Sequence, residues 1–275
     1  PVLTAAALLR IPALLWEGNR IPGRSVRLSA RLATLRTVSY AATVDRLPAP
    51  TFVTGTPIRD LGSVETSAAR ARLGLTADVP VLLGFGGSQA VKRLSDAVRE
   101  ALPDVVARCY VLHITGESAI DEAEALRASL SPEHQDRYRP YAFLQEDMDA
   151  ALSAADLLVG RAGSSTLAEA AAAGLPMIVV PYPHAAAHQT ANAAEMVEAG
   201  AADLVDDEDL DGDTLRAACD LLFDQRLAAM SGAALSVARP GAAAASAHLL
   251  EILAAREPLP SQDELDELTR AASTK

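Results

Sequence analysis

Few cysteines and no recognisable metal-ligand spacing set the first limits on this 275-residue sequence. Cys109 and Cys219 are the only two cysteines and lie far apart in the sequence, which fits reduced thiols better than a disulfide framework or a zinc site. Reduced thiols in a cytosolic protein are the expected state. No combination of His, Cys and carboxylate residues has the spacing of a known metal site. We therefore expect neither a metal nor another cofactor.

Positive charge and long apolar runs are also scarce. Lys and Arg number 24 against 36 Asp and Glu, which gives a formal net charge of −12. Nucleic-acid binding needs a basic surface that displaces counterions, so we expect no nucleic-acid partner. The longest apolar runs are interrupted by Arg10, Glu169 or Gly174, far short of the ~20 residues that span a membrane. Any membrane contact is expected to be peripheral.

Short apolar runs alternate with helical patterns from Pro80 onward, and the 50% hydrophobic content is sufficient for buried cores. This alternation predicts an α/β fold with a parallel sheet and right-handed crossovers. The predicted strands of this part cover 81–85, 109–116, 138–144, 157–159, 177–181 and 203–205. A first portion, with strands predicted at 12–16, 37–40 and 52–54, is too short for a complete nucleotide-binding half. We therefore expect the opening strands of that first domain to be missing.

The stretch from Asp156 to Asn192 carries the strongest functional signal. It predicts a buried strand, a tight turn at Gly163, an Ala-rich helix and a second apolar strand. Ser164, Ser165 and Thr166 fall where the helix begins, so unpaired N–H groups and the positive end of the helix dipole face outward together. Such a helix end binds phosphate.

Glu169 fits two interpretations. With Thr166 it forms a capping-box pattern, in which its carboxylate serves only the helix end. Alternatively, a carboxylate one turn into a phosphate-binding helix accepts two hydrogen bonds from a ribose cis-diol. His188, Gln189 and Asn192 open the next helix, and we expect their polar groups to face the same crevice.

Three further positions have a functional and a purely structural interpretation. Ser88 and Gln89 end a glycine-rich turn that begins at Gly84, which either lets the backbone approach a ligand or only joins strand to helix. Arg59 lies in a domain linker placed at about 54–62, where its guanidinium could bind a diphosphate. Its structural interpretation is a solvated surface arginine, as most arginines are. Asn19 follows a strand, where ligands of open α/β sheets bind, but Asn is also a common turn residue.

Several motifs point in one direction together. They are WEGNRIPG at 16–23, TGTPIR at 54–59, GFGGSQ at 84–89, FLQEDM at 143–148 and RAGSSTLAEAAAAGLPMIVVPYPHAAAHQTANA at 161–193. They resemble the MurG family of GT-B glycosyltransferases, glycosyltransferase family 28. Members of that family move GlcNAc from UDP-GlcNAc to lipid I and so form lipid II in peptidoglycan biosynthesis, at the inner face of the plasma membrane.

The resemblance implies a domain plan and a site. Two Rossmann-like domains are expected: an incomplete acceptor domain at 1–57 and a UDP-sugar domain at 58–239. A helix at 240–256 returns to the first domain, and Pro258, Pro260 and five acidic residues predict an exposed, disordered tail at 257–275. The implied UDP-GlcNAc contacts are Ser164, Ser165, Thr166 and Leu144 at the uridine and diphosphate, Glu169 at the ribose, His188 and Gln189 at the sugar, and Asn19, Arg59, Ser88, Gln89 and Asn192 for the remainder.

Departures from the family pattern limit what is carried over. The glycine-rich opening loop, which holds the family's catalytic base, has no counterpart here, so no catalytic residue is assigned. Where family members have HEQN, this sequence has WEGN at 16–19. Where they have GGSQG, this sequence has Ala90 in place of the last glycine. Two alternatives stay open: a related UDP-sugar-dependent lipid glycosyltransferase, or a catalytically incomplete UDP-sugar-binding module that needs a partner chain.

Overall fold

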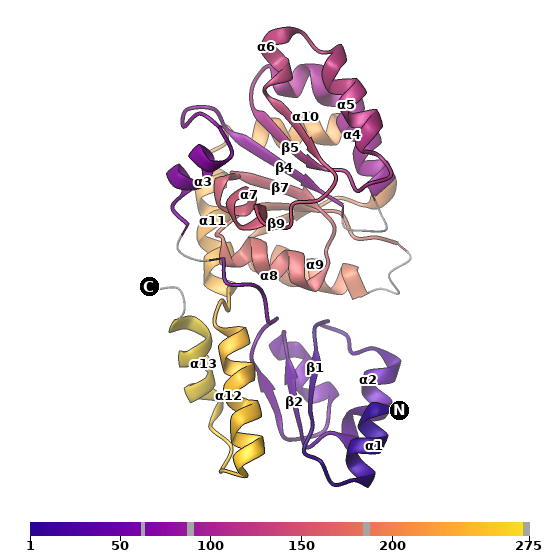
Figure 1. Cartoon of the computed structure of the whole chain (residues 1–275), viewed down its shortest axis with the longest axis vertical. Helices are drawn as coiled ribbons and strands as arrows, with labels where there is room; N and C mark the ends of the chain where they lie inside the picture. The colour runs from indigo at the N-terminus through magenta and orange to yellow at the C-terminus, as the bar shows by residue number, and fades with distance from the viewer. Residues whose placement is uncertain (62–63, 87–90, 184–187, 272–275) are drawn as a thin grey trace. The chain divides into compact units, whose positions relative to one another are not determined.

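The chain forms two compact units in the computed structural model, which describes residues 1–61, 64–86, 91–183 and 188–271 (Figure 1). One unit combines Pro1–Asp60 with Ala238–Lys275, and the other comprises Leu61–Val237. We call them the first and second units. Ser88 and Gln89 lie outside the described residues. No helix in the described part of the chain is long and apolar enough to cross a membrane.

The first unit is built on a three-stranded parallel sheet with the order β1-β2-β3. Its core joins Leu35 of β2 to Ala245, Leu249 and Leu253 of one long helix, α12, and to Leu265. Residues far apart in the sequence therefore bury one apolar surface. The elements of this unit are α1 (Val2–Leu8), β1 (Leu14–Glu17), α2 (Arg24–Ser29), η1 (Ala30–Leu32), β2 (Leu35–Val38), η2 (Ala41–Arg46), β3 (Thr51–Val53), α12 (Ala242–Ala255) and α13 (Gln262–Ala271).

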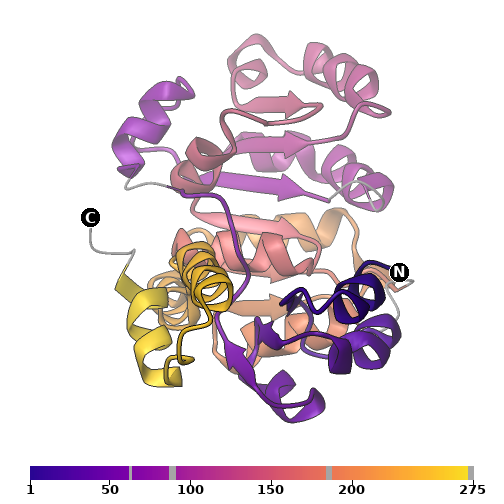
Figure 2. The ribbon, with the colours of Figure 1, turned by 60° about the horizontal axis from the view of Figure 1, so that its bottom comes forward.

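Helix α13 corrects the prediction of a disordered tail, which is wrong for Gln262–Ala271. Figures 1 and 2 both show α13 beside α12, and Leu265 on it is fully buried. The Gln262 side chain accepts from the Val53 N–H and donates to the Val53 carbonyl, both at 2.9 Å, as a neighbouring strand would. Composition misled because the prolines precede the helix, and Ser261 with Glu264 forms a capping box at its start.

The second unit contains a six-stranded, fully parallel sheet with the order β6-β5-β4-β7-β8-β9. The predicted parallel α/β architecture is confirmed. Its strands are β4 (Val81–Phe85), β5 (Tyr110–Ile114), β6 (Tyr138–Tyr141), β7 (Leu157–Gly160), β8 (Met177–Val179) and β9 (Ala202–Leu204). Its helices are α3 (Thr66–Arg72), α4 (Val91–Val106), α5 (Ile120–Ser129), α6 (Pro132–Gln135), α7 (Met148–Ala154), α8 (Ser164–Ala172), α9 (His188–Glu198), η3 (Asp207–Asp209), α10 (Gly212–Leu221) and α11 (Arg226–Val237).

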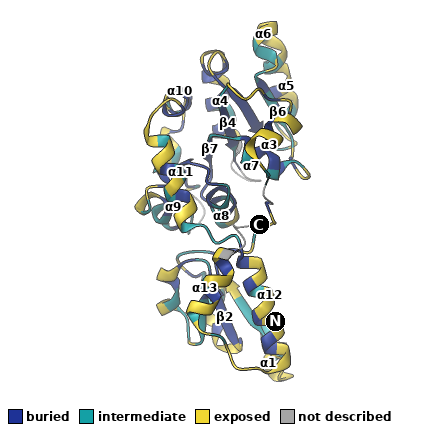
Figure 3. Cartoon of the chain, turned by 90° about the vertical axis from the view of Figure 1, so that its left-hand side faces the viewer, coloured by how far each residue is buried: buried dark blue, intermediate teal, exposed yellow. Residues whose placement is uncertain are grey.

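Helices cover both faces of this sheet. Figure 1 shows α4, α5 and α10 on one face and α8 and α9 on the other. The main core lies under α4 and α10, where Leu82, Val111 and Leu157 of three strands meet Leu102 and Leu215 of the two helices. Figure 3 shows β4 and β7 in the colour of buried residues, whereas α3 and α11 carry exposed faces. Strands buried on both faces explain the continuous apolar runs in the sequence.

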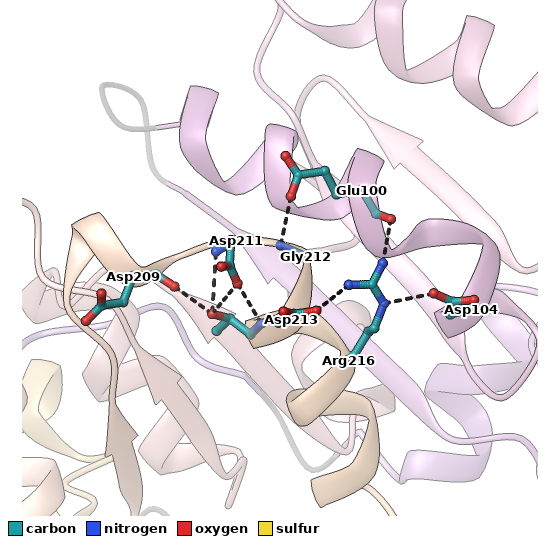
Figure 4. A network of polar contacts seen from close by, with 8 residues as sticks. Glu100, Asp104, Asp209, Asp211, Gly212, Asp213 and Arg216 are labelled. Atoms are coloured by element: carbon teal, nitrogen blue, oxygen red, sulfur yellow. Dashed lines mark hydrogen bonds and ion pairs between the residues drawn. The ribbon is translucent and has the colours of Figure 1, made fainter.

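One residue of the acidic segment 206–213 caps helix α10. Asp211 caps α10: its carboxylate accepts from the Thr214 N–H at 3.0 Å, and the Thr214 hydroxyl accepts from the Asp211 N–H at 3.4 Å (Figure 4). The Gly212 N–H donates to the Glu100 carboxylate at 3.1 Å, and Arg216 donates to the Glu100 carbonyl at 3.1 Å. These bonds fix the start of α10 on α4.

Candidate functional site

The strand order places a crevice between β4 and β7. The chain runs outward from β4 to β6 and then crosses to β7 on the other side of β4. The helices that follow β4 and β7, α4 and α8, cover opposite faces of the sheet (Figure 1), and ligands of open α/β sheets bind at such a switch point. The two strands approach closely here, because a Cβ on Gly160 would lie 2.6 Å from the Phe85 carbonyl oxygen.

Helix α8 begins at this switch point and is not capped by a side chain. Gly163 is its N-cap residue, and Thr166 is already its third residue. The capping box that Thr166 and Glu169 suggested is therefore not formed with Thr166 as the N-cap residue. The first N–H groups of a helix have no acceptor within it, so this end presents donors and a positive dipole end to an anion.

The predicted residues on α8 differ in exposure. Ser165 is exposed, Ser164 and Thr166 are half-buried, and Glu169 in the second turn is only 9% exposed. A carboxylate with so little solvent contact needs hydrogen-bond donors around it, because burial of a charge is costly. Leu144 is buried in the segment between β6 and α7, beyond the carboxyl end of β6.

The start of α9 joins the same edge of the sheet. The Gln189 carbonyl oxygen accepts from the Tyr182 N–H at 2.8 Å, which leaves the NH₂ group of that side chain as its donor. Asn192 is fully buried and donates to the Ala162 carbonyl at 3.5 Å, so it supports the loop before α8. His188 is the first residue of α9 and is half-buried.

Asn19 and Arg59 belong to the first unit. Asn19 follows β1, and its backbone N–H and its side-chain amide both donate to the Glu17 carboxylate at 2.9 Å. Glu17 is 4% exposed and also accepts from the Gly23 N–H at 3.0 Å, so it fixes the whole loop. Arg59 follows β3 and is exposed.

The sequence interpretation missed a buried arginine at the switch point. Arg161 follows β7 directly, forms an ion pair with Asp207 and donates to the Val180 carbonyl at 3.2 Å. Its guanidinium carbon lies 5.5 Å from the centre of the Tyr182 ring. Asp207 also pairs with Arg93 of α4 at 3.3 Å. The available signal was an arginine placed directly after an apolar strand.

A cleft of about 610 Å³ lies beside these residues, between the first turns of α4 and the ends of β7 and β8. Its lining includes Lys92, Arg93 and Asp96 from α4, together with Arg161, Tyr182 and Asp207. Within the described ranges, no group of three or more His, Cys, Asp or Glu residues is arranged to hold a metal ion.

Residues 81–247 match the C-terminal domain of glycosyltransferase family 28. The chain belongs to glycosyltransferase family 28. A Frankia casuarinae family member is 39% identical over 265 residues, which cover 93% of this chain and 68% of the relative. A Moorella thermoacetica member is 36% identical over 255 residues, covering 88% and 68%. Both are named UDP-N-acetylglucosamine–N-acetylmuramyl-(pentapeptide) pyrophosphoryl-undecaprenol N-acetylglucosamine transferase. This family-28 chain thus spans about two thirds of their length.

Solved structures agree with this family-28 assignment. MurG from Acinetobacter baumannii matches with a TM-score of 0.71 and 28% identity, over 92% of this chain and 69% of that one. The S. aureus MnaA–UDP structure matches with a TM-score of 0.65 at 15% identity, covering 94% and 74%, which supports the fold alone. The predicted resemblance to MurG and the predicted GT-B fold are therefore confirmed.

Proposed function

We propose that this chain acts in an inverting glycosyltransferase that moves GlcNAc from UDP-GlcNAc to lipid I and forms lipid II in peptidoglycan biosynthesis. The observation that carries this proposal is the start of α8 at the switch point of the sheet, where a glycine and no capping side chain holds the N-cap position. It occurs in a chain whose relatives bear the name of that transferase. Donor and lipid-linked acceptor are the proposed partners.

The donor is assigned to the second unit. The N–H groups at the start of α8, with Ser164, Ser165 and Thr166, hold the diphosphate, and Glu169 accepts from the ribose hydroxyls. Leaving UDP gains negative charge as the glycosidic bond breaks, and a fixed helix dipole stabilises that charge without reorganisation. Leu144 belongs at the uridine. His188, Gln189 and Asn192 lie on the adjoining α9, and the first two are assigned to the sugar hydroxyls.

The acceptor is assigned to the first unit. Asn19 lies in the loop that the buried Glu17 holds rigid. The contacts of Asn19 and Arg59 with UDP-GlcNAc stay predictions from the sequence. The transfer needs a base to take the proton of the acceptor hydroxyl. We assign that role to no residue of this chain.

Peripheral membrane contact at the inner face of the plasma membrane is assigned to the basic and apolar start of the chain. Residues 1–60 hold eight arginines against three acidic residues, although the whole chain is acidic. Leu8 is 80% exposed on α1 and Leu28 is 84% exposed on α2, where Arg24 and Arg27 accompany it. Exposed apolar side chains among arginines favour the interface of anionic bilayers. Co-sedimentation with anionic but not zwitterionic vesicles, lost in Leu28→Glu, is the expected result.

Calorimetric titration of this chain with UDP-GlcNAc, UDP-GalNAc and UDP tests the donor assignment. Hydrogen bonds to a charged group contribute about 1.5–3 kcal/mol, so Glu169→Ala should weaken UDP binding about 10- to 100-fold. Glu122→Ala, on the exposed first turn of α5, is the matched control and should bind as the unmodified chain does. A folded chain that binds none of the three ligands would refute the donor site.

A further inference from the structure

A buried cluster of opposite charges lies at the carboxyl edge of the sheet in the second unit. Arg161 directly follows β7 and is only 7% exposed. Its side chain bonds to the Val180 carbonyl at the end of β8 and pairs with Asp207. Asp207 pairs in turn with Arg93 of α4. We call Arg161, Asp207 and Arg93 the charge clamp, because three elements meet in it.

The charge clamp reaches the α9 side of the crevice through Tyr182. The Arg161 guanidinium lies against the Tyr182 ring, with 5.5 Å to its centre. The backbone N–H of the same tyrosine donates to Gln189 at 2.8 Å. A shift of Tyr182 would therefore move the partner that orients the Gln189 amide.

The clamp also reaches the start of α4. Arg93 pairs with Asp207 at 3.3 Å and donates to the Glu208 carbonyl at 3.3 Å. Arg93 is in the first turn of α4, which starts at Val91 and so closely follows the glycine-rich segment in the sequence. Asp207 thus holds α4 and the ends of β7 and β8 together, whereas α8 lies on the other face of the sheet (Figure 1).

We propose that the charge clamp positions Gln189 toward the transferred sugar, without touching the donor itself. The inference rests on the proposed function and names a specificity device within that site. Arg161 and Asp207 are positioning residues: they fix Tyr182, Tyr182 fixes the Gln189 carbonyl oxygen, and the Gln189 NH₂ group then donates to a sugar hydroxyl. The uridine and ribose contacts, which are assigned to α8, do not depend on this chain of contacts.

A second arginine–aspartate pair of the same sheet provides a matched control. Arg70 is 11% exposed as a side chain and pairs with Asp156 at 2.6 Å, and Asp156 also accepts from the Val81 N–H at 2.7 Å. Asp156 directly precedes β7, whereas Arg161 directly follows it. The two pairs therefore differ in which end of the strand they hold, and only one lies at the crevice.

The experiment compares UDP-GlcNAc with UDP as ligands of Asp207→Asn and Asp156→Asn, by calorimetry at a temperature where thermal melts show each variant folded. One hydrogen bond is worth about 0.5–1.5 kcal/mol, so Asp207→Asn should weaken UDP-GlcNAc binding about two- to tenfold. Its affinity for UDP should change less than about twofold. Asp156→Asn should lower the melting temperature and leave the ratio of the two affinities unchanged.

A double-mutant cycle with Gln189→Ala decides whether the clamp acts through that residue. If it does, Asp207→Asn in the Gln189→Ala background causes no further loss of UDP-GlcNAc affinity relative to UDP. Asp207→Glu should restore part of the preference for UDP-GlcNAc. Equal weakening of UDP and UDP-GlcNAc, no weakening of either, or additive losses in the double variant would overturn the inference. Absence of UDP binding by the unmodified chain would instead overturn the proposed function, and this inference with it.

Discussion

Protonation of His113 should limit the stability of the second unit in mild acid. His113 lies on β5, is 1% exposed, and its Nδ1 is 2.9 Å from the Tyr138 hydroxyl. Its Nε2 is 3.4 Å from the Ser95 hydroxyl of α4. Burial lowers the pKa of His113 from 6.5 to about 4, because the charged ring would lose its hydration.

The sign follows from comparing the folded and unfolded chains. The unfolded chain binds a proton at His113 near pH 6.5, whereas the folded chain binds it only near pH 4. Acid therefore favours the unfolded chain, and this contribution to stability is lost as the pH falls from about 6.5 to about 4. One pKa unit corresponds to about 1.4 kcal/mol, so the full loss is about 3 kcal/mol, of which about 2 kcal/mol falls between pH 8 and pH 5.

Urea unfolding at pH 8 and pH 5, followed by far-UV circular dichroism, measures this loss. The matched control is the double variant His113→Phe/Tyr138→Phe, which removes both partners of the buried His113–Tyr138 hydrogen bond and leaves only the half-buried Ser95 hydroxyl without its contact. Trp16 is the only tryptophan and lies in the first unit, so its fluorescence reports that unit separately. The unmodified second unit should lose about 2 kcal/mol more than the control between the two pH values. Equal losses in both proteins would refute the reasoning.

Three further predictions concern stability and thiol access. Gly160→Ala should destabilise the second unit by about 1–3 kcal/mol, because the added Cβ would collide with the Phe85 carbonyl. Gly232→Ala is the control, because a Cβ there has nothing within 4 Å, and it should leave the urea midpoint unchanged. Ser261→Ala removes the capping box with Glu264 and should lower the free energy of unfolding of the first unit by about 1 kcal/mol. Urea unfolding followed by tryptophan fluorescence measures this loss, and an unchanged midpoint would contradict it. Both cysteines are buried free thiols, so a thiol reagent should label them only in urea, and fast labelling without urea would contradict their burial.

The sequence predicted the second unit well because its signals are local. Strand β4 spans the predicted residues 81–85, and β7 and α8 follow the predicted strand, turn and helix. Apolar strands bounded by glycine and proline need no long-range information. By contrast, α11 was not predicted, because its Ala, Gly and Ser residues carry no strong apolar stripe. Its place is fixed by packing on α8 and by Met230 in the main core.

The candidate site was predictable only where one segment carries it. The start of α8 is visible in the sequence, but the pattern of Thr166 and Glu169 also fitted a capping box, and only the structure shows that Gly163, not Thr166, is the N-cap residue. The pairing of Arg161 with Asp207 joins residues 46 positions apart, and no local pattern announces it. Long-range ion pairs need the fold before they can be recognised.

The first unit is assembled from both ends of the chain, and this has a consequence during synthesis. Val53 and Gln262, which bond to each other, are 209 residues apart. At about 5–20 residues per second, a ribosome needs on the order of 10 to 40 s to make the residues between them. The second unit is continuous and can fold within that interval. Strand β3 waits with an unpaired edge until α13 emerges, so the nascent chain should depend on chaperones at this edge.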